Sequence, residues 1–301
     1  MPTNRHFSVM AAALGDDARQ AIATSRSMGF DGLLFDAHSQ QLNLSDLSGT
    51  GRREFTHILK SNGQTPVAIR ADIGPKGFGP GADLDRLLSG LDRVLQVARD
   101  LNAGAVTIDL GPLPEPVEPV KPKSRITPEQ AGIILIPGPR DIPTDAKTQA
   151  APTGRPADPA FIAHVDGALQ VLCEIAERYQ VQVALRSSLS GFASVDRAMN
   201  SVRCPWFGIN LDPVAILHDR WSVDEIFSRF GNSILQVLAR DAIRGDGGRT
   251  KPMPVSEGNV EWDKLLAALD AAAYRGWITF DPSDLPNPID ALRTGLARLK
   301  S

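Results

Sequence analysis

The segment FGINLDPVAILHDR, residues 207–220, contains one complete unit of the predicted fold. A mostly apolar run suited to a buried strand ends at Asp212, and Pro213 opens a segment that continues as a helix. Strands followed by helices build α/β proteins, and barrel enzymes keep their chemistry at the carboxyl ends of the strands. Asp212 is therefore a candidate functional residue.

The same unit recurs along the chain of 301 residues. Short apolar runs alternate with amphipathic segments, of which residues 84–103 have the clearest helical period. Eight such units predict an α/β fold, a (β/α)8 TIM barrel, and no glycine-rich dinucleotide fingerprint supports an open sheet instead. The strand candidates are HFSVMAA (6–12), DGLLFDA (31–37), TPVAIRADI (65–73), AVTIDL (105–110), VQVALR (181–186), FGINLD (207–212), ILQVLARD (234–241) and GWITFD (276–281).

Helices are expected between these strands, with room for one wherever the pattern is weak. The segments with helical pattern are residues 16–28, a stretch from about residue 47, 84–103, 161–180, 223–230, 261–273 and 289–299.

A proline-rich insertion, residues 111–159, interrupts the alternation after the fourth strand. It holds 12 of the 23 prolines of the chain, so regular helix is excluded over most of it. We interpret the chain as a single barrel domain, 1–301, with a long loop that starts at the functional face. The loop is a lid, a protein-interaction segment or a poorly ordered variable insertion.

The amino-acid composition restricts the classes of binding partner and the cellular compartment that we expect for the protein. The formal charge of −3 gives no reason to expect nucleic acid binding, and no apolar stretch approaches a membrane span. The N-terminus reads as a first strand rather than a signal sequence. Two cysteines, Cys173 and Cys204, are too few for a disulfide framework, so we expect reduced thiols in a cytoplasmic protein. The sequence does not indicate the oligomeric state.

The order of the motifs resembles that of the xylose isomerase-like TIM barrels, the sugar phosphate isomerase/epimerase superfamily that includes endonuclease IV. MGFDGLLFD (28–36) looks like the family's second-strand signature, and NLDPVAIL (210–217) looks like its sixth-strand motif. ILQVLARD (234–241) is similar to its seventh strand. The most specific match is PVSEGNVEWDKLLAALDAAAYRGWITFD (254–281), which resembles the stretch from the Gly-Glu-Gly loop to the eighth strand.

The resemblance implies a divalent cation such as Mn²⁺, Mg²⁺ or Zn²⁺, held by Glu, Asp, His and Glu after strands five to eight. Asp212 keeps the aspartate, but Arg186 stands in place of the first glutamate and Leu238 in place of the histidine. Asp281 replaces the last glutamate, and Ala215 replaces a second histidine of the sixth-strand motif.

These substitutions argue against the family's usual chemistry. A permanently protonated guanidinium would repel a cation, so we predict no metal and no other cofactor. The family uses the strand-five and strand-eight glutamates as acid and base, and Arg186 cannot act as a base. We predict instead that Arg186 forms ion pairs with Asp212 and Asp281, which makes these three residues the candidate catalytic set.

Further polar residues near strand ends are candidate substrate-binding groups. A structural salt bridge within the barrel would also explain the presence of each one taken alone. With Arg186 they are Asp36, His38, Arg70, Asp109, Arg240, Asp241 and Glu257.

Three functions remain open. The first is a divergent relative, without the metal and the classical activity, that keeps a pocket for a sugar or a sugar phosphate. The second is an active metal-independent isomerase or epimerase with Asp281 or Asp36 as its base. The third is a scaffold that binds a protein partner through the proline-rich loop. For the first, the arginines predict tighter binding of anionic than of neutral sugars.

Overall fold

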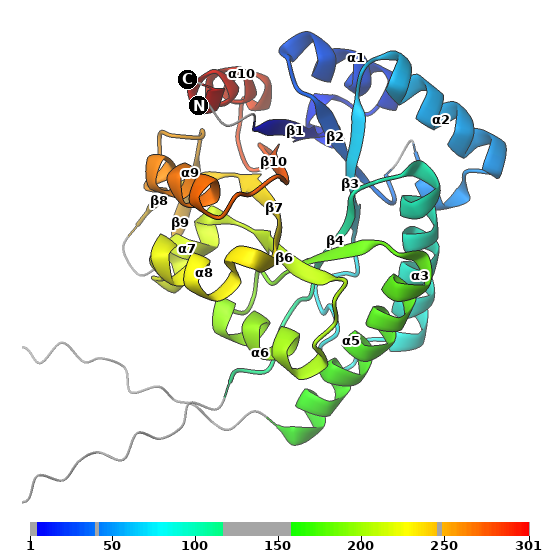
Figure 1. Ribbon diagram of the computed structural model, residues 1–301, viewed down its shortest axis with the longest axis vertical. Coiled ribbons are helices and arrows are strands. Elements are labelled where there is room, and N and C mark those ends of the chain that lie inside the picture. The colour runs from blue at the N-terminus through cyan, green and yellow to red at the C-terminus, as the bar shows by residue number, and fades with distance from the viewer. Residues whose placement is uncertain (1–4, 40–41, 117–157, 246–248, 301) are drawn as a thin grey trace, which may run out of the picture.

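The computed structural model describes residues 5–39, 42–116, 158–245 and 249–300. Eight parallel strands close into a barrel in the order β1-β10-β7-β6-β5-β4-β3-β2, which confirms the predicted (β/α)8 fold (Figure 1). All eight strand candidates form barrel strands: β1 His6–Met10, β2 Gly32–Asp36, β3 Thr65–Ala71, β4 Ala105–Asp109, β5 Gln182–Arg186, β6 Phe207–Leu211, β7 Ile234–Ala239 and β10 Trp277–Phe280.

Helices surround the strands, and α10 closes the ring beside β1 near the N-terminus (Figure 1). The weak pattern after β5 does contain a helix, α6, which starts at Gly191 without a side-chain cap. The helices are α1 Ala18–Met28, α2 Gly49–Ser61, α3 Leu84–Leu101, α5 Pro159–Tyr179, α6 Phe192–Val202, α7 Pro213–Asp219, α8 Val223–Phe230, α9 Trp262–Ala271 and α10 Pro288–Lys300.

Alternation along the strands sorts side chains into two sets. Outward residues such as Val183, Leu185 and Ile209 are 0–1% exposed, and they form the main core against the helices. A separate small cluster inside the barrel includes Ala68, Ala105 and Ala184. The small side chains of these three alanines leave room for polar side chains inside the barrel.

A two-stranded antiparallel sheet, β8 Asp241–Arg244 and β9 Thr250–Met253, follows β7 outside the barrel. This sheet is absent from the elements predicted from the sequence. It places a loop of residues 254–260 over the end of β8.

Most of the proline-rich insertion lies outside the described residues, as do the predictions of a lid or an interaction segment. Its first residues are described and are firmly held. Gly111 has a φ of +67°, and a Cβ there would lie 2.8 Å from the backbone nitrogen of Gly77, so the close approach requires glycine. Ser187 donates a hydrogen bond to the Gly111 carbonyl, 2.7 Å away.

The prediction of reduced thiols is wrong in this structure. Cys173 on α5 and Cys204 before β6 form a disulfide, with their Cα atoms 5.8 Å apart. The two residues are 31 positions apart in sequence, and only the packing of α5 against α6 brings them together. Disulfides are typical of oxidising compartments, so the cysteines no longer support the predicted cytoplasmic location.

Helix α5 also corrects the expectation about apolar stretches. By length and composition it is apolar enough to cross a membrane, with a mean hydropathy of 1.2. Its buried residues, among them Val165, Leu169 and Leu172, pack into the barrel core, as in the core helices of soluble proteins.

Candidate functional site

The carboxyl ends of the barrel strands surround a cavity of about 460 Å³, which we call the mouth cavity. Inward residues at the ends of β2, β3, β4 and β5 reach it because they share the same face of their strands. Its lining includes Asp36, His38, Arg70, Asp109, Arg186, Asn210, Leu238 and Asp281.

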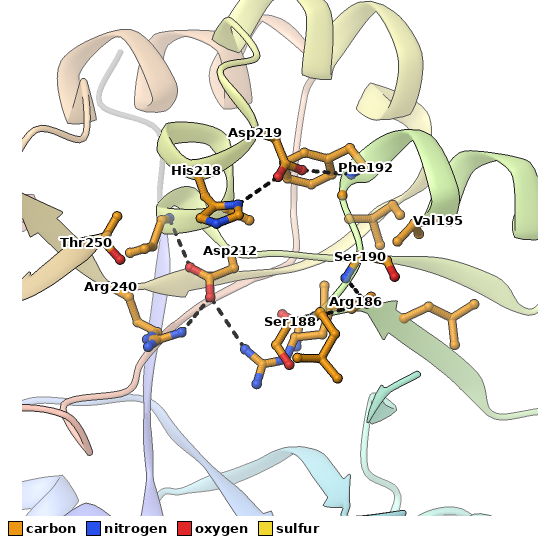
Figure 2. A pocket seen from close by; sticks show the side chains of 18 residues that line it. Arg186, Ser188, Ser190, Phe192, Val195, Asp212, His218, Asp219, Arg240 and Thr250 are labelled. Atoms are coloured by element: carbon orange, nitrogen blue, oxygen red, sulfur yellow. Dashed lines mark hydrogen bonds and ion pairs between the residues drawn. The ribbon is translucent and has the colours of Figure 1, made fainter. Parts of the chain in front are cut away.

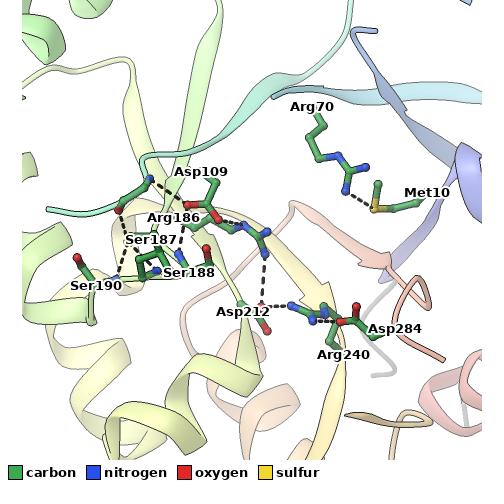
Figure 3. A network of polar contacts seen from close by, with 12 residues as sticks. Met10, Arg70, Asp109, Arg186, Ser187, Ser188, Ser190, Asp212, Arg240 and Asp284 are labelled. Carbon is green, nitrogen blue, oxygen red and sulfur yellow. Dashed lines mark hydrogen bonds and ion pairs between the residues drawn. The ribbon is translucent and has the colours of Figure 1, made fainter. Parts of the chain in front are cut away.

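A row of alternating charges crosses one side of the mouth (Figure 3). The Arg186 side chain places Nε 3.3 Å from Asp109 Oδ2 and Nη1 3.5 Å from Asp212 Oδ2. Arg240 contacts the same Asp212 oxygen at 2.6 Å and also binds Asp284. We call these five residues the charge row. The predicted pair of Arg186 with Asp212 is confirmed.

The predicted pair of Arg186 with Asp281 is wrong. Asp281 accepts hydrogen bonds from the backbone nitrogen and the hydroxyl of Ser283 instead. Its strand, β10, lies between β1 and β7, whereas β4 neighbours β5 and sets Asp109 opposite Arg186 in register. Side chains on adjacent strands are close neighbours, whereas β6 and β7 lie between β5 and β10.

Burial and charge act in opposite directions on Arg240. Burial lowers the pKa of its guanidinium, but the charges of Asp212, Asp281 and Asp284 outweigh this effect and hold the pKa above its ordinary value. The side chain of Asp212, only 13% exposed, faces the guanidinium groups of both Arg186 and Arg240.

A second ion pair lies on the other side of the mouth. Arg70 Nε is 2.5 Å from Asp36 Oδ1, and the two residues are register partners on β3 and β2. Arg70 also points Nη1 at the sulfur of Met10, 3.6 Å away. Both candidate residues thus line the mouth cavity.

The remaining substrate-binding candidates have different surroundings. His38 lines the mouth and contacts Asn43 Oδ1 through Nδ1 at 2.8 Å. Asp241 is 3% exposed, and its oxygens accept hydrogen bonds from the 254–260 loop and from the indole of Trp262. These contacts give Asp241 a structural role, and its assignment as a substrate ligand stays a prediction. Glu257 is exposed and lines none of the cavities described here.

The donor set does not suit a divalent cation. Within the described residues, no group of three or more His, Cys, Asp or Glu side chains could hold a metal. Leu238 lies in the mouth lining without a donor atom, and Arg186 places positive charge beside Asp109 and Asp212. His218, the only histidine near Asp212 in sequence, contacts Asp219 instead.

A second cavity, the side pocket, has a volume of about 200 Å³ and lies beside the charge row (Figure 2). The ends of β5 and β6, the 187–191 loop and the first residues of α6 and α7 enclose it. Asp219 fixes this wall by accepting a 2.8 Å hydrogen bond from the backbone nitrogen of Phe192. No feature of the sequence had indicated this pocket.

Asn210 is a further residue that sequence reasoning missed. It is 5% exposed, it lines both cavities, and its Oδ1 is buried without a hydrogen-bond partner in the described structure. Its position two residues before Asp212 places it on the same strand face, which was the available signal. A buried acceptor without a donor is costly unless a ligand or water supplies one.

Comparison with known proteins identifies the family of the chain. No curated protein matches it in sequence. Its fold is similar to that of several solved structures. One is a xylose isomerase domain protein from Planctomyces limnophilus, with 15% identity, a TM-score of 0.68 and coverage of 98% of this chain and 94% of that one. The probable 3-DHS dehydratase AsbF from Bacillus anthracis has 14% identity, a TM-score of 0.70 and coverage of 98% of this chain and 99% of that one, and a D-psicose 3-epimerase from Clostridium cellulolyticum, solved with D-tagatose, has 13% identity, a TM-score of 0.68 and coverage of 98% of both chains. Likenesses at this level of identity show the fold and not the activity. The model of one family matches residues 22–301, and the chain belongs to that family, the xylose isomerase-like TIM barrels.

Proposed function

We propose that this protein binds a sugar in the mouth cavity without the divalent metal and the paired carboxylates of an isomerase or epimerase. The observation that carries the proposal is the position of Arg186. Its guanidinium lies between Asp109 and Asp212, where the family resemblance implies a metal-binding glutamate. The charge that a cation would supply is therefore already present.

The size and lining of the mouth cavity support a sugar. A volume of about 460 Å³ lies within the range of small-molecule sites. Its lining contains both donors and acceptors, which suits hydroxyl groups because each hydroxyl both donates and accepts. The buried Oδ1 of Asn210 would accept a hydrogen bond from one of them. A structural neighbour, the D-psicose 3-epimerase, was solved with D-tagatose.

The charge of the lining favours a neutral sugar over a sugar phosphate. Four carboxylates, Asp36, Asp72, Asp109 and Asp281, face two guanidinium groups, so the formal charge is −2. An anionic ligand binds well only if it displaces a carboxylate from Arg186. This reverses the preference that the arginines alone suggest in the sequence.

Calorimetry tests the proposal with a panel of neutral pentoses and hexoses and their phosphates, each measured in EDTA and in Mn²⁺. We expect a neutral sugar to bind with the same affinity in both buffers, and elemental analysis after dialysis to find no stoichiometric metal. Binding that needs Mn²⁺, or about one bound equivalent of Mn or Zn, would overturn the proposal.

Asn210→Leu supplies a matched variant. It removes an unsatisfied buried acceptor, so we expect unchanged or higher stability together with about tenfold weaker sugar binding. Asn232→Leu, an exposed change outside the cavities, is the control. Unchanged affinity in Asn210→Leu removes Asn210 from the site.

A second candidate function, metal-independent isomerisation, rests on Asp281. This carboxylate lines the mouth cavity, and its contacts in the described structure are to Ser283 rather than to an arginine, so it is available as a base. Exchange of carbon-bound hydrogen in deuterated water, followed by NMR and lost in Asp281→Asn, would support this function. Absence of exchange at every carbon of a bound sugar would exclude it.

A further inference from the structure

The side pocket combines apolar and polar walls. Seven of its 18 lining residues are apolar: Leu185, Leu189, Phe192, Val195, Ile209, Val214 and Ala215. Leu185 and Ile209 lie on the outward faces of β5 and β6, so they bring side chains of the main core to the pocket. Figure 2 shows Arg186, Asp212 and Arg240 together along one side of the pocket. The pocket thus has an apolar part, formed by these seven side chains, and a charged border.

The two cavities adjoin one another. They share the lining residues Arg186, Ser188, Leu189 and Asn210, so the border between them runs along the ends of β5 and β6. Leu189 is 65% exposed at this border, an unusual position for a leucine beside a polar cavity. A ligand that rests over Arg186 in the mouth can therefore extend into the side pocket.

The volume of the side pocket defines what it holds. An apolar cavity of about 150 Å³ binds benzene, so a pocket of about 200 Å³ accommodates one aromatic ring or a short branched chain. A sugar ring gains little from apolar walls, because its hydroxyls would lose hydrogen bonds to water there.

We propose that the mouth cavity and the side pocket form one two-part site, whose ligand is a neutral sugar carrying a small apolar or aromatic substituent. The sugar occupies the mouth, and the substituent fills the side pocket beside Phe192 and Val195. This inference rests on the proposed sugar binding and adds the class of ligand to it.

Calorimetry with paired ligands tests the inference. The pairs are the methyl and phenyl β-glycosides of glucose, galactose and xylose. For each sugar that binds, we expect the phenyl glycoside to bind at least about tenfold more tightly, because the ring is removed from water.

Filling the pocket should abolish this difference. Ala215→Phe places a ring in the pocket from α7, and we expect it to keep the affinity for the methyl glycoside and to lose the phenyl advantage. Ala267→Phe makes the same change on the exposed side of α9, outside the cavities, and should retain both affinities. Val214→Phe is a second filling variant, should Ala215→Phe melt at a lower temperature than the parent.

The outcomes separate the two proposals. Methyl and phenyl glycosides of equal affinity, or a phenyl advantage that survives both filling variants, overturn the two-part site and leave sugar binding in place. If no free sugar and no glycoside binds, both proposals fall.

Discussion

Arg186 shows how one substitution changes the chemistry of a barrel mouth. A guanidinium offers several donors in a fixed plane, so it can contact Asp109 through Nε and Asp212 through Nη1 at the same time. The side chain is 25% exposed, and partly buried charges need such partners. We expect the positive charge that neutralises the two carboxylates also to disfavour a metal cation beside them.

Reversing this charge should destabilise the protein. Arg186→Glu places a third carboxylate between Asp109 and Asp212, and we expect a loss of about 2–4 kcal/mol in the free energy of unfolding at neutral pH. Crowding raises the pKa of these carboxylates in the folded state, so the loss should shrink as the pH falls toward 4. Urea unfolding at both pH values measures it.

Arg293→Leu is the control for this prediction, because Arg293 forms an exposed pair with Asp290 on α10. It should change stability by no more than about 0.5 kcal/mol. An Arg186→Glu protein as stable as the parent at neutral pH would contradict the ion-pair arrangement of the charge row.

At the scale of single elements, Asp241 determines how the chain leaves the barrel after β7. Its carboxylate accepts hydrogen bonds from the backbone nitrogens of Ser256, Gly258 and Val260. A Cβ on Gly258 would lie 2.1 Å from Asp241 Oδ1, so only glycine allows this approach. One buried charge thus organises the whole 254–260 loop.

Removing that charge should loosen the loop. In Asp241→Ala, several backbone N–H groups and the indole of Trp262 lose their acceptor, and we expect a loss of about 3 kcal/mol or more in stability. Urea unfolding and limited proteolysis should show lower stability and faster cleavage within residues 254–260. Asp290→Ala, at an exposed site, is the control, and an equally small effect in both variants would show that Asp241 does not anchor the loop.

The disulfide connects α5 to the segment between α6 and β6. It closes a loop between residues 31 positions apart, for which the loss of chain entropy in the unfolded state predicts a stabilisation of about 3–4 kcal/mol. A reductant should lower the melting temperature of the parent and leave a Cys173→Ser, Cys204→Ser double variant unaffected. Two titratable thiols per chain in the native, air-oxidised protein would contradict the bond.

At the scale of the whole molecule, three positions for which the family resemblance implies metal ligands lie around one cavity. Arg186, Leu238 and Asp281 come from β5, β7 and the end of β10, and all three line the mouth cavity. Replacement of several residues together should therefore recreate a site that no single replacement creates.

The variant Arg186→Glu, Leu238→His, Asp281→Glu should bind Mn²⁺ together with Asp212. Saturating metal at about 100 times the dissociation constant adds about 2.7 kcal/mol of stability, which thermal unfolding with and without Mn²⁺ detects. Arg186→Glu alone should show no comparable gain. If the triple variant gains nothing from Mn²⁺, the three positions do not converge as the family resemblance implies.

The sequence by itself determined the barrel. Hydrophobic patterning identifies all eight strands, because a buried parallel strand needs an apolar run whatever its neighbours are. The family resemblance correctly paired Arg186 with Asp212. The short sheet β8–β9 escaped prediction because its strands are polar and partly exposed, with Pro252 in one of them.

Only the tertiary structure determined which side chains contact one another. Asp109, rather than Asp281, is the second partner of Arg186, because β4 and not β10 is the neighbour of β5 in the closed barrel. The bond between Cys173 and Cys204 and the enclosure of the side pocket likewise arise where segments distant in sequence pack together. Patterning reports which face of an element is buried, whereas ion pairs and cavities depend on distances between elements, which a linear pattern does not contain.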